Sequence, residues 1–252
     1  MQVFGGTQAV RSKGDVSNVV TDADLASERI IVDGIRRAFP THSIIAEETG
    51  YVPAGSEFTW VVDPLDGTSN FAAGIPWFGV LIAVLRAGRP VAAVLHLPAM
   101  SDLYVAEAGS GAYRNGNRVT VTKSQALHEV LWAYGMDAKS SQSESELDVR
   151  LLFQLLGRVR NIRATNSLVD AAFTADGRLG GVLNRSTRVW DIAAPMLIVQ
   201  EAGGLYTDAR GQPLVLDVSP AGPEKQYAVL AGAPHLHAEV AALVRSVENT
   251  RV

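Results

Sequence analysis

Two carboxylates end an apolar stretch in the sequence WVVDPLDGTSNF, which covers residues 60–71. Val61 and Val62 are typical of a buried strand, and Asp63 and Asp66 follow at its end. Carboxylates this close repel each other unless a cation lies between them. Hard divalent cations such as Mg²⁺ take oxygen ligands. The stretch therefore predicts a metal site whose other ligands come from elsewhere in the chain.

Two further acids stand at the ends of expected elements, which is where site residues often lie. Glu47 follows the short apolar stretch 43–46, and Asp191 begins an apolar helix. Acids at such positions also shape turns or cap helices. Position alone therefore leaves each of the four acids open to a purely structural interpretation.

The turn after Asp63 combines features that suit both a cation and an anion. Pro64 stiffens the turn, which would let the carbonyl of Leu65 point inward beside the acids. Gly67 has no side chain, so its amide and that of Thr68 can approach an anion closely, as at many phosphate sites.

Bound metal ions would allow this cluster of carboxylates to bind a phosphate ester. A phosphate monoester is a dianion, which uncompensated carboxylates would repel and bound metal ions would attract. Accelerations of up to about 10²¹ are known for the hydrolysis of such esters, whereas a single general base contributes only about 10²–10⁴. Metal electrostatics must therefore supply most of the rate in such a site.

The elements that must position these acids are indicated by hydrophobic periodicity. A helix is predicted over residues 22–39, where Leu25, Ile31 and Ile35 share one face and Pro40 ends it. The other strands expected in the first half are 43–46, 78–86, 91–97, 103–106 and 112–114. The first half is therefore predicted to combine one helix with a largely antiparallel sheet.

The second half is predicted to alternate between helix and strand. A polar loop is expected over residues 139–146. The predicted helices are 147–159, 167–175, 190–202 and 234–247, and the predicted strands are 179–183, 205–207 and 227–231. Pro195 is tolerable only in the first turn of its helix, which agrees with Asp191 standing at the helix start.

The composition is that of an ordinary globular protein. The chain has 252 residues, of which 47% are hydrophobic and 19% charged, and its net charge is −4. This balance argues against a nucleic-acid surface or a polybasic membrane patch. There is no cysteine, so thiolate chemistry and disulfides are excluded.

No apolar run approaches the roughly 20 residues of a membrane span, and the first residues lack the apolar core of a signal peptide. We therefore predict a soluble, cytoplasmic protein without a nucleic-acid or membrane partner.

Three blocks of sequence together resemble one known family. The blocks IIAEET, DPLDGTSNF and WDIAAPMLIVQEAGG resemble the inositol monophosphatase family of Mg²⁺-dependent, lithium-sensitive sugar phosphatases, and the likeness runs from about Lys13 to the C-terminus. The resemblance implies an α+β fold, an alternating αβαβα layered sandwich, as a single domain over residues 1–252. Within it, an α+β lobe (1–120) and an α/β lobe (121–252) would hold the metal site between them. A homodimer is also expected.

The resemblance implies which residues hold two or three Mg²⁺ ions. Glu47, Asp63 and the Leu65 carbonyl would hold one ion, and Asp63, Asp66 and Asp191 would hold a second. A third, weaker ion would use Glu47 and water molecules.

The resemblance also implies catalytic and substrate-binding roles. Glu47 and the Thr68 hydroxyl would orient and activate the attacking water, and Asp24 would lie behind the third ion as a further catalytic residue. The residues expected to bind phosphate or substrate are Asp66, Gly67, Thr68, Asn184 and Asp191.

The substrate is expected to be a small phosphorylated polyol or a related monoester. Inositol monophosphate is the default, and histidinol phosphate, fructose 1,6-bisphosphate and 3′-phosphoadenosine 5′-phosphate are alternatives within the family. Asn184 stands where inositol-selective relatives carry a glutamate, so the preference for inositol stays open. Arg185 and Arg188 could meet a second anionic group or could be ordinary exposed arginines. A non-catalytic, sugar-phosphate-binding regulator is the alternative from another class, although the four acids and Thr68 are all present.

Asp24 and its neighbours allow two other interpretations. Thr21 and Asp24 fit a capping box at the start of a helix, which is compatible with a role beside the metals. The sequence Asp22-Ala23-Asp24 also superficially resembles phosphatases of the haloacid dehalogenase type, in which an aspartate is the nucleophile. That pattern wants Thr or Val at the position of Leu25, which disfavours it.

Two histidines and the N-terminal residues lead to further expectations. His235 and His237 flank a leucine at a helix start and are expected at the surface. Family members carry another helix before the position of Lys13, so the chain is expected to begin short, by truncation or by a misassigned start codon.

Overall fold

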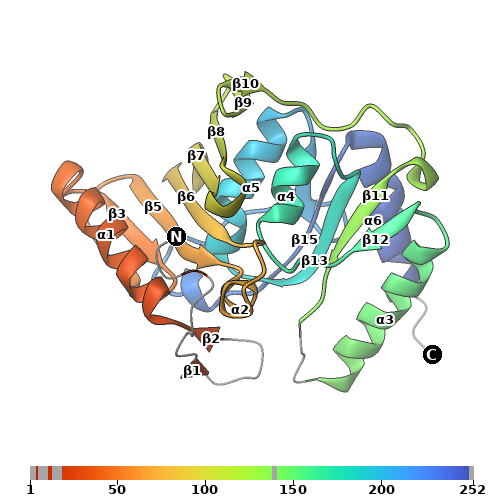
Figure 1. Cartoon of the computed structure of the whole chain (residues 1–252), viewed down its shortest axis with the longest axis horizontal. Coiled ribbons are helices and arrows are strands. Elements are labelled where there is room, and N and C mark those ends of the chain that lie inside the picture. Colours follow the sequence, from red (N-terminus) through yellow and green to blue (C-terminus); the bar gives the residue numbers. More distant parts are fainter. Residues whose placement is uncertain (1–3, 5–10, 13–18, 138–140, 250–252) are drawn as a thin grey trace.

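The computed structural model describes residues 4, 11–12, 19–137 and 141–249 (Figure 1). Its two main sheets have the strand orders β10-β9-β8-β7-β6-β5-β3-β4 and β12-β11-β13-β15-β14. The strands of the larger sheet are β3 (Ser43–Ala46), β4 (Gly50–Val52), β5 (Phe58–Asp66), β6 (Gly79–Arg86), β7 (Arg89–Leu97), β8 (Asp102–Glu107), β9 (Gly111–Arg114) and β10 (Asn117–Arg118). Those of the smaller sheet are β11 (Leu131–Gly135), β12 (Asn161–Arg163), β13 (Gly181–Thr187), β14 (Leu205–Asp208) and β15 (Tyr227–Gly232). A separate pair is formed by β1 (Arg11–Ser12) and β2 (Val19–Val20).

The helices and the two sheets alternate in five layers (Figure 1). The first helix, α1 (Asp22–Ala38), packs on β5 of the larger sheet. Between the sheets lie α4 (Val169–Ala175) and α5 (Val189–Glu201), and α5 contacts strands of both. On the far side of the smaller sheet, α3 (Gln142–Leu156) and α6 (Pro234–Asn249) contact each other. The predicted αβαβα layered sandwich is thus confirmed.

The central helix α5 is apolar on nearly all sides because it is covered by two sheets. Ile192, Leu197 and Ile198 are all buried, although they point in different directions around the helix. The helix begins at Val189, so Pro195 lies in its second turn rather than in the first turn, as predicted. Because proline has no N–H, the Asp191 carbonyl loses the donor that position 195 would normally supply.

Two other expectations on element boundaries were wrong. Residues 142–146 belong to α3 rather than to a polar loop, while 139–140 lie outside the described residues. Gln142 and Glu146 share a hydrogen bond of 2.8 Å one turn apart, and such pairs favour the helix despite its polar sequence. Strand β5 does not end before the acids but runs to Asp66, with a register shift between Asp63 and Asp66. This bulge turns both carboxylates toward the same end of the sheet.

The remaining elements are short or lie at the periphery. The helix α2 (Thr68–Ala72) follows β5 directly. His237 was expected at the surface, but it is 3% exposed and shares a hydrogen bond of 2.8 Å with Thr207, because it lies on the inner face of α6. Within the described residues, no helix combines the length and the apolar character that crossing a membrane requires.

Candidate active site

A cleft of about 750 Å³ lies where β5 of the larger sheet and the helix α2 that follows it face β13, α4 and α5. It gathers every predicted site residue except Asp24, which lies behind Thr68. The predicted residues that line the cleft are Glu47, Asp63, Leu65, Asp66, Gly67, Thr68, Asn184 and Asp191. Residues up to 144 positions apart in the sequence therefore meet at one cavity, from Glu47 to Asp191.

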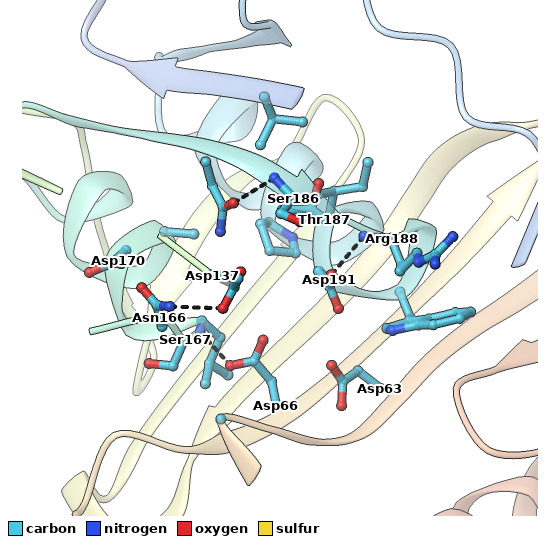
Figure 2. Close-up of a pocket in the computed structure, with 18 of the residues that line it drawn as sticks. Asp63, Asp66, Asp137, Asn166, Ser167, Asp170, Ser186, Thr187, Arg188 and Asp191 are labelled. Atoms are coloured by element: carbon cyan, nitrogen blue, oxygen red, sulfur yellow. Dashed lines mark hydrogen bonds between the residues drawn. The ribbon is translucent and has the colours of Figure 1, made fainter. Parts of the chain in front are cut away.

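Three aspartates form the centre of the site (Figure 2). Asp63, Asp66 and Asp191 each offer a carboxylate oxygen, and these oxygens lie within 4.8 Å of one another. Asp63 is 2% exposed, and its Oδ1 accepts a hydrogen bond of 3.0 Å from the Leu65 amide. Such convergence of like charges is costly without a counter-ion.

The pKa values of all three carboxyl groups are raised, so each group holds a proton more readily than an exposed aspartate does. Burial raises the pKa of Asp63 well above its ordinary value, and the charges of Glu47, Asp66 and Asp191 raise it further. Burial also raises the pKa of Asp66 to about 7, although the hydrogen bond from the Leu168 amide lowers it in part. The pKa of Asp191 is raised by burial and then by the charge of Asp66.

The donor set fits a hard divalent cation. It consists of oxygen ligands only, which Mg²⁺ prefers. A bound cation would offset both causes of the raised pKa values, the burial of the carboxylates and the repulsion between them. Glu47 follows β3, and its amide donates to the Val62 carbonyl at 3.2 Å, which fixes its backbone beside β5. Its charge acts on all three aspartates. Asp63, Asp66 and Asp191, together with Glu47 and the Leu65 carbonyl, could thus hold the ions.

The turn into α2 requires glycine at position 67. Gly67 has a φ of 80°, a conformation that side chains disfavour, and a Cβ built there would lie 2.5 Å from the Trp77 carbonyl oxygen. The bare backbone of Gly67 and Thr68 therefore faces the cleft at the start of α2, where amide groups have no partner within the helix.

Asp24 links the start of α1 to Thr68. Its Oδ2 accepts hydrogen bonds from the Thr21 amide at 2.8 Å and from the Thr21 hydroxyl at 2.5 Å, and Thr21 Oγ1 accepts from the Ala23 amide. Its Oδ1 lies 2.9 Å from the Thr68 hydroxyl, which also lies 2.9 Å from the Leu65 carbonyl. The capping box and the contact with Thr68 therefore coexist.

Backbone amides of the second half orient two of the aspartates. The Leu168 amide donates to Asp66 Oδ1 at 2.6 Å, and the Arg188 amide donates to Asp191 Oδ2 at 2.7 Å. Asn70 adds a bond of 2.9 Å from its Nδ2 to the Thr165 carbonyl. The hydrogen bond between Leu168 and Asp66 thus connects the larger sheet directly to the start of α4, while the Arg188 amide orients Asp191 within the start of α5.

The two arginines near Asn184 have different surroundings. Asn184 lines the cleft, and its Oδ1 accepts a hydrogen bond of 2.9 Å from the Ser186 amide. Arg185 is not placed to meet a substrate anion, because its Nη1 pairs with the buried Asp148 at 2.8 Å. Arg188 does line the cleft, while its guanidinium donates to the Glu224 carbonyl.

The dehalogenase-type interpretation receives no support from the geometry. Asp22 is exposed at the start of α1, pairs with Arg11 at 2.8 Å and does not line the cleft. Lys13, where the family likeness begins, lies outside the described residues.

The cleft also contains residues that the sequence did not indicate. Asp137 and Asn166 lie side by side in the lining of the cleft, joined by a hydrogen bond of 2.9 Å from Asn166 Nδ2 to Asp137 Oδ1 (Figure 2). Asp170, on α4, lines the cleft and is 4% exposed. A usable signal existed for Asp137, because it follows the apolar stretch of β11 just as Glu47 follows β3.

Comparison with known proteins gives a consistent picture. The inositol monophosphatase family matches residues 1–249. The Nus factor SuhB of Salmonella typhimurium is 38% identical over 197 residues, which cover 77% of this chain and 73% of that protein. The Inositol-1-monophosphatase of Rhizobium meliloti is 37% identical over 219 residues, 82% of each chain. The Fructose-1,6-bisphosphatase/inositol-1-monophosphatase of Thermotoga maritima is 35% identical over 210 residues, 83% of this chain and 78% of that protein.

Solved structures agree with the sequence matches. The Thermotoga maritima IMPase structure superposes with a TM-score of 0.86 at 32% identity, covering 99% of this chain and 92% of that one. The suhB protein of Bartonella henselae gives a TM-score of 0.83 at 31% identity, covering 94% and 88%. The chain therefore belongs to the inositol monophosphatase family.

Proposed function

We propose that this protein hydrolyses a small phosphate monoester in a Mg²⁺-dependent reaction, by direct attack of water and without a phosphoenzyme. The observation that carries the proposal is the convergence of Asp63, Asp66 and Asp191 within 4.8 Å, beside Glu47 and the Gly67 turn. Inositol monophosphate is the reference substrate, which agrees with the name of the Rhizobium meliloti relative.

The family resemblance assigns the metal-binding roles, and the lining of the cleft supports them. Glu47, Asp63 and the Leu65 carbonyl would hold one ion, and Asp63, Asp66 and Asp191 would hold another. When bound, magnesium attracts the phosphoryl oxygens, lowers the pKa of water and stabilises charge on the attacking and leaving oxygens. The amides of Gly67 and Thr68 orient the phosphate toward the cleft.

Thr68 and Glu47 act on the attacking water. The Thr68 hydroxyl has one proton, which it donates to Asp24 or to Leu65, so its oxygen lone pair is left to accept a hydrogen bond from water. Glu47 takes the water proton as the new O–P bond forms. The P–O bond to the alcohol breaks, and the proton that Glu47 took from water passes to the leaving alkoxide oxygen, which regenerates the Glu47 carboxylate. Asp24 thus acts through Thr68 by fixing the direction of its proton.

A substrate panel tests the proposal. Inositol 1-phosphate, histidinol phosphate, fructose 1,6-bisphosphate and 3′-phosphoadenosine 5′-phosphate are offered with and without Mg²⁺ and lithium, and phosphate release is measured. We expect Mg²⁺-dependent turnover that lithium inhibits and that Glu47→Gln or Asp191→Asn abolishes. Asp22→Asn is the control, because Asp22 lies outside the cleft. Turnover that survives Glu47→Gln but not Asp22→Asn would instead indicate an aspartyl nucleophile.

A regulatory role is the second candidate, because relatives at 37–38% identity carry the name Nus factor SuhB. Metal-loaded protein that releases no phosphate from any substrate, yet binds phosphate esters, would favour it. The absence of a nucleic-acid partner stays a prediction. A single two-lobed domain and a homodimer also remain proposals, to be tested by calorimetric unfolding and by sedimentation.

A further inference from the structure

One face of α1 carries buried polar side chains, which is unusual for a helix in an outer layer of the fold. Asp24, Ser27 and Glu28 are spaced three and four residues apart, so they lie on the same side of the helix. Asp24 is 0% exposed, Glu28 is 4% exposed and Ser27 is half-buried. Buried polar groups need hydrogen-bond partners. We call these three residues the clamp, because of the partners they have.

Each residue of the clamp binds a different segment of the larger sheet. Asp24 accepts a hydrogen bond from the Thr68 hydroxyl at the start of α2. Ser27 Oγ donates to the Pro64 carbonyl at 2.8 Å, within the bulge of β5. Glu28 binds the turn that follows β3. All three segments that contribute site residues from the larger sheet are thus fastened to α1.

Glu28 binds the chain directly after Glu47. Its Oε2 accepts a hydrogen bond of 2.8 Å from the Glu48 amide, and its Oε1 accepts one from the Thr49 hydroxyl. The Glu47 amide donates to the Val62 carbonyl at 3.2 Å. The backbone of Glu47 is therefore held on both sides, by β5 at its own amide and by α1 at the next amide. Holding this backbone fixes the origin and direction of the Glu47 side chain.

The opposite side of the metal site is oriented without α1. The Leu168 amide donates to Asp66, and the Arg188 amide donates to Asp191. Both amides belong to the second half of the chain. The ion expected at Glu47 therefore depends on α1 more than the ion expected at Asp191 does.

We propose that Glu28 is a positioning residue for Glu47, and that the clamp assembles the part of the metal site that contains Glu47. Glu28 does not line the cleft, so it acts from behind, through the Glu48 amide and the Thr49 hydroxyl. The loss of a buried partner behind a metal ligand typically weakens metal binding by about 10–100-fold. This inference rests on the metal dependence of the proposed function.

Two substitutions at position 28 separate hydrogen bonding from packing. Glu28→Ala removes both hydrogen bonds. Glu28→Gln keeps them, because the glutamine oxygen accepts from the Glu48 amide and its amino group donates to the Thr49 hydroxyl oxygen. Val32→Ala is the matched control: Val32 is 4% exposed on the same helix and packs in a hydrophobic cluster, so its truncation loosens α1 without removing a bond of the clamp.

Calorimetric titration with Mn²⁺ measures how many ions bind and how tightly. We expect at least two ions in the wild-type protein. In Glu28→Ala, one of them should bind about tenfold or more weakly while another keeps its wild-type affinity, and Glu28→Gln should recover most of the loss. Val32→Ala should lower the melting temperature and leave the affinities unchanged. Wild-type affinities in Glu28→Ala, or an equal loss in Val32→Ala, would overturn the inference.

Hydrogen exchange of the metal-free protein gives a second readout, which needs neither bound metal nor activity. The Glu48 amide should exchange about tenfold faster or more in Glu28→Ala than in Val32→Ala, because only the first variant removes its acceptor. If the wild-type protein binds no Mn²⁺, the proposed function fails, and this exchange alone decides whether Glu28 holds the chain beside Glu47. Equal exchange of the Glu48 amide in the two variants would then refute the inference.

Discussion

Asp24 shows how one carboxylate serves two elements through its two oxygens. Oδ2 accepts a hydrogen bond from the Thr21 amide and so helps to cap α1. Oδ1 accepts a hydrogen bond from the Thr68 hydroxyl at the cleft. A substitution of Asp24 itself would disturb both contacts, so each threonine must be changed separately.

Thr68→Val should remove catalysis with little effect on folding. The change deletes the hydroxyl that accepts a hydrogen bond from water, and we expect kcat to fall by about 10²-fold or more. Thr21→Val is the matched control: it removes a helix cap and should cost about 1 kcal/mol of stability while kcat stays near the wild-type value. Steady-state kinetics measures kcat of both variants, and thermal unfolding measures their stability. An equal loss of kcat in the two would mean that Asp24 acts only by holding α1.

The site residues divide into those that local sequence can indicate and those that it cannot. Asp63 and Asp66 are visible because they interrupt an apolar strand within a distinctive string. Asp170 lies in the apolar stretch LVDAAF, where a lone acid could have drawn attention, but its buried position depends on the packing of α4. Hydrogen bonds between Asn166 and Met136 join residues 30 positions apart, and no local pattern encodes that contact.

At the scale of elements, the connection between β5 and α2 depends on one glycine. Gly67→Ala combines a φ of 80° with a Cβ 2.5 Å from the Trp77 carbonyl oxygen. We expect it to lower stability by about 1–3 kcal/mol and to reduce kcat/KM sharply, because the turn that faces the phosphate must shift. Chemical denaturation and kinetics measure the two effects.

Gly74→Ala separates backbone strain from the steric clash. Gly74 has a φ of 76°, but a Cβ added at this position would meet no atom within 4 Å. The substitution should therefore cost about 1 kcal/mol and leave kcat/KM near the wild-type value. If both variants lost activity equally, the close approach at Gly67 would not matter for the site.

The buried pair of Arg185 and Asp148 fastens α3 to the smaller sheet. The Tyr134 hydroxyl also donates to Asp148 Oδ1 at 2.8 Å, so the carboxylate is shared by three elements. Arg185→Met should destabilise the protein by about 3–5 kcal/mol, because it leaves a buried charge unpaired. The double variant with Asp148→Asn should lose less stability in urea denaturation. A double variant as unstable as Arg185→Met alone would contradict this account.

Element positions were easier to predict than element ends. The α5 helix is recognisable from its apolar sequence, but its start at Val189 depends on the cap that Asp191 forms with the Arg188 amide. His237 reads as a polar residue at a helix start, and only the packing of α6 on the sheet shows that it is buried. The layered order came from the family resemblance, since periodicity alone does not say which helix covers which sheet.

At the scale of the whole molecule, metal binding and stability should be coupled through pH. The folded protein raises the pKa of Asp66 from 3.8 to about 7 and that of Asp63 and Asp191 in the same direction, chiefly by burial. At a pH between the unfolded-state pKa and the folded-state pKa, the folded protein holds protons that the unfolded protein releases. The metal-free protein should therefore lose stability as the pH rises from about 4 to about 7.

Magnesium should reverse this loss. Because protons compete with the ion for the same carboxylates, we expect Mg²⁺ to raise the melting temperature more at pH 8 than at pH 5. Asp66→Asn removes one repelling charge, so it should raise the metal-free melting temperature at pH 8 and diminish the gain from Mg²⁺. Differential scanning calorimetry of both proteins measures this. An equal gain from Mg²⁺ at both pH values would argue against carboxylate ligands.

The central claim is that the acids of the cleft bind divalent cations next to the phosphate, and diffraction tests it most directly. Crystals soaked with Mn²⁺ and inorganic phosphate would be measured for anomalous scattering. We predict at least two manganese peaks in the cleft, each within about 2.5 Å of oxygens from Asp63, Asp66, Asp191 or Glu47, with phosphate density beside Gly67. Manganese bound elsewhere, with these four acids free of metal, would contradict the claim.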